Sequence, residues 1–206
     1  SGELTAMPGL LLVVSGPSGA GKGTVCNLLR AREPRIWYSI SATTRPPRRG
    51  EVAGRDYLFV SVEEFEDLIA RGAFLEWARV YGHYYGTLRA PVEAALQEGK
   101  DVLLEIDTQG ALQVKNKYPA AILVFLLPPS LNELQARITR RGTDTEEAIR
   151  ARLEAASAEL AHICAYDYAV VNDNVEEAVR KIQAIMVAEK CRVVRGAFLG
   201  NEQAVP

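Results

Sequence analysis

The sequence predicts a layered α/β domain built on a parallel sheet with helices on its faces. Short apolar runs recur along the chain, and each is followed by a segment with helical periodicity. The first run ends in the glycine-rich stretch GPSGAGKGT at residues 16–24, as expected for a turn from a buried strand into a helix. The chain has 206 residues, 48% of them hydrophobic, which suffices for one buried core and a small insertion.

The core elements follow in chain order. Continuous apolar segments predict buried strands at residues 10–15, 102–106, 121–127 and 168–171. A helix is expected from about Lys22 to Arg32, directly after the glycine-rich turn. The later strands are each followed by a helical pattern, so we expect alternating strands and helices around a parallel sheet.

Two segments interrupt this alternation. Residues 36–90 predict a small mixed α/β insertion with a short helix at 62–71, where Ser61 and Glu64 fit a capping box. Residues 140–153 join two charged helices through a Gly-Thr-Asp turn. The remaining segments form the expected core domain: residues 7–35, 91–139 and 154–206.

Composition excludes several classes of protein. The net charge of −2 and the pI near 5.8 argue against binding to a nucleic acid polymer. The three cysteines form no C-x-x-C pair, which argues against a disulfide framework or a zinc site. Apolar runs such as residues 10–14 are too short to span a bilayer, and the first residues lack the basic start and cleavage site of a signal peptide. We therefore expect a cytoplasmic protein without a membrane partner.

The stretch at residues 16–24 is interpreted as a phosphate-binding loop. Glycines let backbone N–H groups surround an anion, the helix start adds positive potential, and Lys22 can reach the β and γ phosphates. Gly23 stands where the usual loop has Ser or Thr, whereas Thr24 follows one position later, as in the similar loops of adenylate and cytidylate kinases. The alternative is a glycine-rich turn that arose by chance.

A second motif is rich in arginine. Arg45, Arg48, Arg49 and Arg55 lie close together, and Tyr57 follows. Guanidinium groups match phosphate oxygens in paired hydrogen bonds, and neighbouring prolines stiffen the segment. A solvated run of charge is the alternative interpretation.

These motifs together resemble one family. The pattern S-x-T-T-R-x-P-R-x-G-E-x-x-G-x-D-Y at residues 41–57, followed by FLEWARVYGHYYGT and LEIDTQG, is similar to guanylate kinase over nearly all of residues 10–195. The resemblance implies a P-loop nucleoside monophosphate kinase fold that transfers the γ-phosphoryl group of MgATP to GMP and leaves dGMP open as a second acceptor. It also implies that residues 36–90 are the GMP-binding domain and residues 140–153 a helical lid.

The resemblance also implies a GMP site. The GMP phosphate would be held by Arg45, Arg48, Tyr57 and Tyr85. The base would be read by Ser41, Glu76, Thr87 and Asp107. Guanine offers two adjacent donors beside an acceptor, so a carboxylate with nearby hydroxyls complements it, whereas adenine presents an acceptor to that carboxylate. Core packing is the alternative for the two tyrosines, and a helix N-cap is a second role for Asp107.

The ATP site follows in the same way. ATP would be bound by Gly16, Pro17, Ser18, Gly19, Ala20, Gly21, Lys22, Gly23, Thr24 and Asn172, the last of which also fits a turn. The transferred group would be stabilised by the catalytic cations Lys22, Arg45, Arg137, Arg141 and Arg152. Mg²⁺ would be held by Thr24 and Glu105, partly through water, although many relatives have Asp where this chain has Glu105.

Other functions are weighed against this one. A GTPase would carry an N-K-x-D motif, and the nearest match, NKYP at residues 116–119, ends in proline. Another nucleoside monophosphate kinase is favoured only by G-K-G-T. A guanylate-kinase-like interaction module shares the fold but usually lacks a working phosphate loop, which is intact here. No oligomeric state follows from the sequence.

Overall fold

A five-stranded parallel sheet forms the centre of the computed structural model, which describes residues 8–139 and 145–193. Its strand order is β2-β7-β1-β8-β9, and every neighbouring pair is parallel. The strands are β1 (Leu11–Ser15), β2 (Trp37–Tyr38), β7 (Val102–Glu105), β8 (Ile122–Leu127) and β9 (Tyr168–Val171). The predicted α/β fold class is therefore confirmed.

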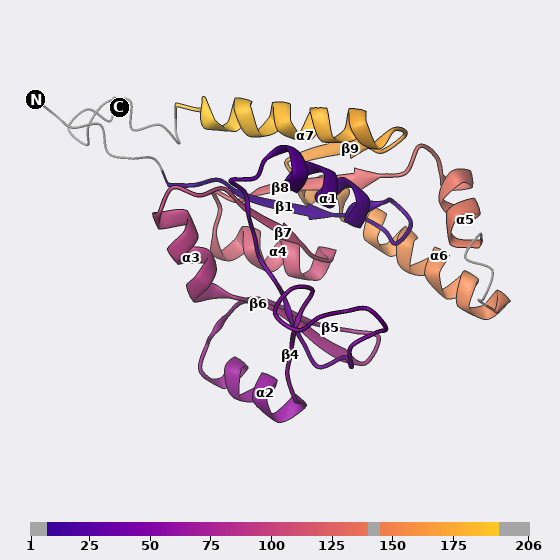
Figure 1. The fold of residues 1–206 in the computed structure, drawn as a ribbon. Helices are drawn as coiled ribbons and strands as arrows, with labels where there is room; N and C mark the ends of the chain where they lie inside the picture. The colour runs from indigo at the N-terminus through magenta and orange to yellow at the C-terminus, as the bar shows by residue number, and fades with distance from the viewer. Residues whose placement is uncertain (1–7, 140–144, 194–206) are drawn as a thin grey trace, which may run out of the picture.

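Helices cover both faces of this sheet (Figure 1). Helices α1 (Lys22–Arg32) and α7 (Val175–Lys190) pack against each other and against one face. Helices α3 (Arg89–Gln97) and α4 (Thr108–Lys117) cover the opposite face. Because β1, β7 and β8 are buried on both sides, they are almost continuously apolar, which is why their positions could be predicted.

A smaller mixed sheet is inserted between β2 and α3. It has the order β4-β3-β6-β5, in which β3 pairs parallel to β4 and antiparallel to β6. Its elements are β3 (Ala42–Thr43), β4 (Leu58–Phe59), α2 (Val62–Ala70), β5 (Phe74–Val80) and β6 (His83–Leu88). Phe65 of α2 stacks on Phe74 at 4.4 Å between ring centroids and gives the insertion a core of its own.

The insertion is fastened to the core domain along strand β5. The Gln113 side chain of α4 accepts a hydrogen bond from the Trp77 amide at 3.1 Å and donates one to the Trp77 carbonyl at 2.7 Å. Lys117 donates to the Leu75 carbonyl at 2.9 Å. These side chains satisfy backbone groups at the edge of the small sheet and fix it against α4.

A third unit consists of α5 (Leu131–Thr139) and α6 (Glu146–Leu160), with the 3-10 helix η1 (Ile163–Ala165) following. Leu134 and Ile138 pack against Ala156 in a separate small core. The predicted lid spans residues 140–153, of which 140–144 lie outside the described residues. Helix α6 continues unbroken past residue 153, so the division at this point stays a prediction.

The sequence analysis did not predict strand β2 or its place in the core sheet. Residues 37–38 fall within the range predicted for the insertion, yet they pair with β7. A two-residue strand is too short to give a periodic signal. The capping box of Ser61 and Glu64 is confirmed at the start of α2. Within the described part of the chain, we find no helix with the length and apolar character needed to cross a membrane.

Candidate functional site

Two neighbouring cavities lie at the edge of the core sheet where the parallel strands end. The first, the loop cavity, has a volume of about 530 Å³ and is lined by the loop after β1, Arg137 and Asn172. The second, the insertion cavity, has a volume of about 380 Å³ and lies between the core and the small sheet. Lys22 and Glu105 line both cavities. A ligand in one cavity therefore meets a ligand in the other at these two side chains.

The loop after β1 has the backbone of an anion site. Gly21 precedes α1 with a φ of 87°, and a Cβ there would lie 2.6 Å from the Asn172 amide nitrogen, so glycine is required. The N-terminal amides of α1 face the loop cavity with their positive potential. The Lys22 ammonium group folds back and donates to the Gly16 carbonyl. In this arrangement Lys22 lies at the mouth of the loop, between the cavities.

Asn172 contributes by fixing the loop. It is buried after β9, and its amide group donates to the Ala20 carbonyl at 2.8 Å. The side chain also lines the loop cavity. The structure thus gives Asn172 a structural contact with the loop backbone, while its predicted role beside ATP stays a prediction.

Of the three arginines predicted to stabilise the transferred group from α5, α6 and the segment between them, only two lie in the described part of the chain. Arg137 lines the loop cavity, donates to the Gly19 carbonyl at 3.3 Å and pairs with Glu133 at 3.0 Å. Arg141 lies outside the described residues. Arg152 is half-buried on α6 and is not among the described residues that line either cavity. A direct role for Arg152 therefore requires movement of α6 toward the loop.

The insertion cavity gathers most of the residues predicted to bind the acceptor nucleotide. They come from the residues just before β3 and β4, from β5 and β6, and from the N-cap of α4, which are far apart in sequence. Those that line the cavity are Ser41, Tyr57, Glu76, Tyr85 and Asp107. The rings of Tyr57 and Tyr85 meet edge to face at 6.1 Å, and both are partly exposed to the cavity. Packing and ligand contact are therefore compatible roles for them.

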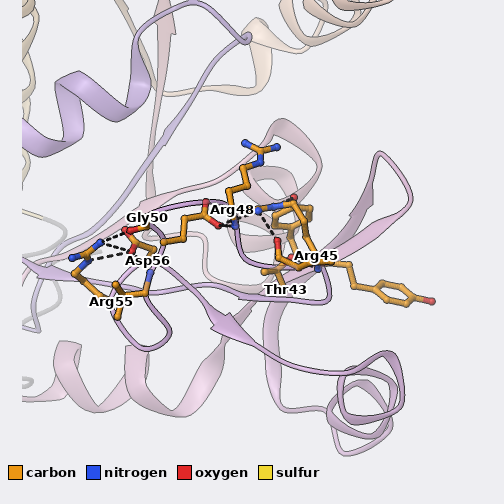
Figure 2. A network of polar contacts seen from close by, with 11 residues as sticks. Thr43, Arg45, Arg48, Gly50, Arg55 and Asp56 are labelled. Atoms are coloured by element: carbon orange, nitrogen blue, oxygen red, sulfur yellow. Dashed lines mark hydrogen bonds and ion pairs between the residues drawn. The ribbon is translucent and has the colours of Figure 1, made fainter.

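Arg45 does not itself line the insertion cavity, but it bonds to two residues that do, Glu51 and Tyr85. Figure 2 shows Arg45 within its network of polar contacts. Its guanidinium group donates to both carboxylate oxygens of Glu51, at 2.8 and 3.0 Å, and to the hydroxyl of Tyr85 at 3.2 Å. Glu51 also accepts from the Arg48 amide at 2.7 Å. The Arg45 guanidinium lowers the pKa of Glu51 below its usual range. Glu51 therefore fixes the orientation of Arg45, which is only 8% exposed.

The other arginines of the motif reach solvent. The Arg48 side chain is exposed, and Arg55 is exposed but pairs with Asp56 at 2.9 Å, as Figure 2 shows. Because these side chains are solvated, they can turn toward an entering anion at little cost. The arginine motif thus combines one buried, paired guanidinium with exposed cations beside it.

Glu76 forms the polar end of the insertion cavity. It is 3% exposed and accepts a hydrogen bond from the Thr87 hydroxyl at 2.7 Å. The pKa of Glu76 is raised to about 7, mainly because the carboxyl group is buried; the Thr87 hydrogen bond lowers it and the neighbouring Asp107 carboxylate raises it. Asp107 caps α4 by accepting from the Gly110 amide at 2.9 Å, so its predicted N-cap role is confirmed. A buried carboxylate with this pKa favours a ligand that supplies hydrogen-bond donors.

The shifted pKa of Glu76 predicts a pH-dependent stability. In the folded protein the group ionises near pH 7, whereas in the unfolded chain it ionises near 4.5, so stability falls as pH rises between these values. Gln cannot ionise, so we expect Glu76→Gln to be more stable than the wild type at pH 8, by about 1–3 kcal/mol. The difference should shrink toward pH 5, as measured by urea unfolding. Glu93→Gln, at an exposed position on α3, is the control. A difference that is the same at both pH values would contradict this assignment.

Glu105 at the junction of the two cavities and Thr24 in the loop cavity fit a magnesium ion bound together with phosphates. Thr24 and Glu105 line the loop cavity and offer the hydroxyl and carboxylate oxygens that Mg²⁺ prefers. A Cβ on Gly23 would lie 3.7 Å from Glu105 Oε1, so this oxygen faces the loop backbone. In the described part of the chain no group of three or more His, Cys, Asp or Glu side chains could hold a metal ion. The donor set suits an ion that keeps water and phosphate ligands.

Comparison with known proteins decides the family. The family model described as guanylate kinase matches residues 9–189. The chain belongs to the guanylate kinase family. A guanylate kinase of Caldanaerobacter subterraneus subsp. tengcongensis is 57% identical over 191 residues, which cover 93% of each chain. A guanylate kinase of Clostridium tetani is 57% identical over 187 residues, or 91% of this chain and 89% of the relative.

A solved structure agrees with this result. The crystal structure of guanylate kinase from Anaplasma phagocytophilum has a TM-score of 0.78 and 37% identity, and the match covers 95% of this chain and 93% of that one. The predicted resemblance to guanylate kinase and the predicted kinase fold are confirmed by these comparisons.

Sequence reasoning missed three side chains that shape this guanylate kinase site. Glu51 lies inside the arginine motif, where a single acid among arginines was an available signal for an ion pair. Tyr38 and Arg30 line the insertion cavity and contact each other, with the guanidinium carbon 4.1 Å from the ring centroid. They come from α1 and β2, and only the tertiary structure brings them together.

Proposed function

We propose that this chain transfers the γ-phosphoryl group of ATP, bound with Mg²⁺, to GMP, giving ADP and GDP. The observation that carries the proposal is the pair of cavities joined at Lys22 and Glu105, with the buried Glu76 carboxylate in the insertion cavity. Membership in the guanylate kinase family supports it.

The loop cavity is the proposed ATP site. Amides of residues 16–24 would hold the phosphates, and Lys22 would leave the Gly16 carbonyl to contact the β and γ groups. Arg137 would move from Glu133 and the Gly19 carbonyl to the transferring group. Mg²⁺ would be held by Thr24 and Glu105 and would neutralise phosphate charge.

The insertion cavity is the proposed GMP site. The fixed Arg45, with Tyr57 and Tyr85, would orient the phosphate, and Arg48 would turn inward to add charge. Ionised Glu76 would accept from the guanine N1 and N2 donors, with Ser41, Thr87 and Asp107 completing the base site. Thr87 would act through Glu76, because its hydroxyl already donates to that carboxylate.

No strong general base is needed for this transfer. The second pKa of a phosphate monoester is roughly 6, so the acceptor oxygen is already anionic near neutral pH. Catalysis would consist of aligning the two phosphates and stabilising charge on the transferring group. Closure of the insertion and of α5 and α6 would exclude water that otherwise hydrolyses ATP.

The proposed location is the cytoplasm. Cys26, Cys164 and Cys191 are all free, as is usual in a reducing compartment. ATP and GMP are the proposed small-molecule partners.

A panel of acceptors tests the proposed function. ADP release, measured in a coupled assay with MgATP, is expected with GMP. It should be at least about a hundredfold less with AMP, CMP or UMP, because a buried carboxylate that accepts from two adjacent donors of guanine rejects bases that lack this pair. A preference for another monophosphate would identify a different kinase. No transfer to any of them would favour an interaction module.

A further inference from the structure

Glu105 lies at the junction of the two cavities, where both the Tyr38 hydroxyl and the Cys26 thiol interact with its carboxylate. Its Oε2 accepts a hydrogen bond from the Tyr38 hydroxyl at 3.3 Å. Tyr38 comes from β2, which pairs directly with β7, the strand that ends at Glu105. The Tyr38 ring is itself covered by the Arg30 guanidinium, 4.1 Å from the ring centroid. The packing of the ring therefore helps to fix the position of the hydroxyl group that contacts the carboxylate.

The other oxygen of Glu105 faces the phosphate loop. A Cβ built on Gly23 would lie 3.7 Å from Oε1, an ordinary contact distance. A hydroxyl-bearing side chain at position 23 would extend into this same region. Gly23 leaves that space free, and Glu105 projects its carboxylate toward it. The Glu105 carboxylate thus faces the space that a side chain at position 23 would occupy.

We propose that Tyr38 is a positioning residue that holds Oε2 of Glu105, so that Oε1 faces Gly23 and serves the nucleotide-bound cation in place of the hydroxyl missing at position 23. The inference rests on the proposed function for the identity of the nucleotide. Tyr38 would act through Glu105, because its hydroxyl already donates to that side chain. A free carboxylate would sample several rotamers, and the hydrogen bond favours one of them.

The substitution Tyr38→Phe tests this role, because it keeps the ring and its contact with Arg30 but removes the hydroxyl. Binding of Mn²⁺ to the protein in the presence of ADP, followed by electron paramagnetic resonance, reports the cation site without turnover. We expect about three- to tenfold weaker Mn²⁺ binding, since one hydrogen bond to a charged group is lost. The Mg²⁺ concentration for half-maximal kinase activity should rise by a similar factor.

Two further variants separate positioning from a general effect on the fold. In a Glu105→Gln background, Tyr38→Phe should weaken Mn²⁺ binding much less, because the group through which it acts has changed. Tyr168→Phe removes another tyrosine hydroxyl that donates to a carboxylate, Glu189 at 2.7 Å, away from both cavities. It should leave Mn²⁺ binding unchanged.

The possible results are distinct. Unchanged Mn²⁺ binding in folded Tyr38→Phe, or an equal loss with and without Glu105→Gln, would overturn the positioning role. Failure of the wild type to phosphorylate GMP would refute the proposed function instead, since Mn²⁺ binding with ADP requires neither GMP nor transfer.

Discussion

Replacing Lys22 with Ala is expected to lower phosphoryl transfer by about a hundredfold or more while the protein remains folded. Lys22 lines both cavities, so its ammonium group is placed where negative charge accumulates between donor and acceptor. A charge directed at the transition state contributes several kcal/mol, on the order of 3 or more, inside a site that excludes water. Steady-state kinetics with ATP and GMP measures kcat, and thermal unfolding checks the fold.

The fold should tolerate this change. In the structure Lys22 is half-buried and donates to the Gly16 carbonyl, so its removal costs the fold about one hydrogen bond, roughly 1–3 kcal/mol. Lys181→Ala on α7, an exposed position away from both cavities, is the matched control and should retain full activity. Near-normal turnover of folded Lys22→Ala would exclude the loop as the catalytic phosphate site.

The core could be predicted from the sequence because its physical requirements are local. Strands β1, β7 and β8 are covered on both faces, so they form continuous apolar segments, and the glycine-rich loop follows the first of them. Strand β2 is different, since its two residues are placed by hydrogen bonds to β7. Its position depends on the neighbouring strand, and no pattern within residues 37–38 predicts it.

In the site, too, residues within motifs could be predicted, whereas contacts between distant residues could not. Glu76 and Asp107 were selected from motifs, and the structure brings both to the insertion cavity. The motif did not reveal that Glu51 forms an ion pair with Arg45, because spacing alone does not determine which acidic side chain pairs with which basic one. Tyr38 was also missed, as its contact with Glu105 joins residues 67 positions apart.

Glu76→Gln is expected to lower kcat/KM for GMP about five- to a hundredfold, with little change in KM for ATP. Ionised Glu76 offers two acceptor oxygens, one already bonded to the Thr87 hydroxyl at 2.7 Å, to the donors of guanine. Gln keeps the size but replaces one acceptor with an NH₂ donor, so one hydrogen bond to the base is lost or opposed, a loss of roughly 1–3 kcal/mol. Steady-state kinetics with GMP and AMP measures the effect, and the preference for GMP over AMP should narrow.

The stability of the same variant distinguishes base recognition from a structural role. Burial raises the pKa of Glu76 to about 7, so the wild type carries a costly buried charge above that pH. If Glu76 serves the base, the substitution stabilises the protein at pH 8 and still weakens use of GMP, and the two effects have opposite signs. If Glu76 only supports the fold, GMP kinetics should remain as in Glu93→Gln, the exposed control on α3. A buried carboxylate is unfavourable for the protein unless a ligand supplies hydrogen-bond donors to it. Unchanged GMP kinetics in Glu76→Gln, or a wild type that prefers AMP, would therefore refute the assignment of Glu76 to the guanine base.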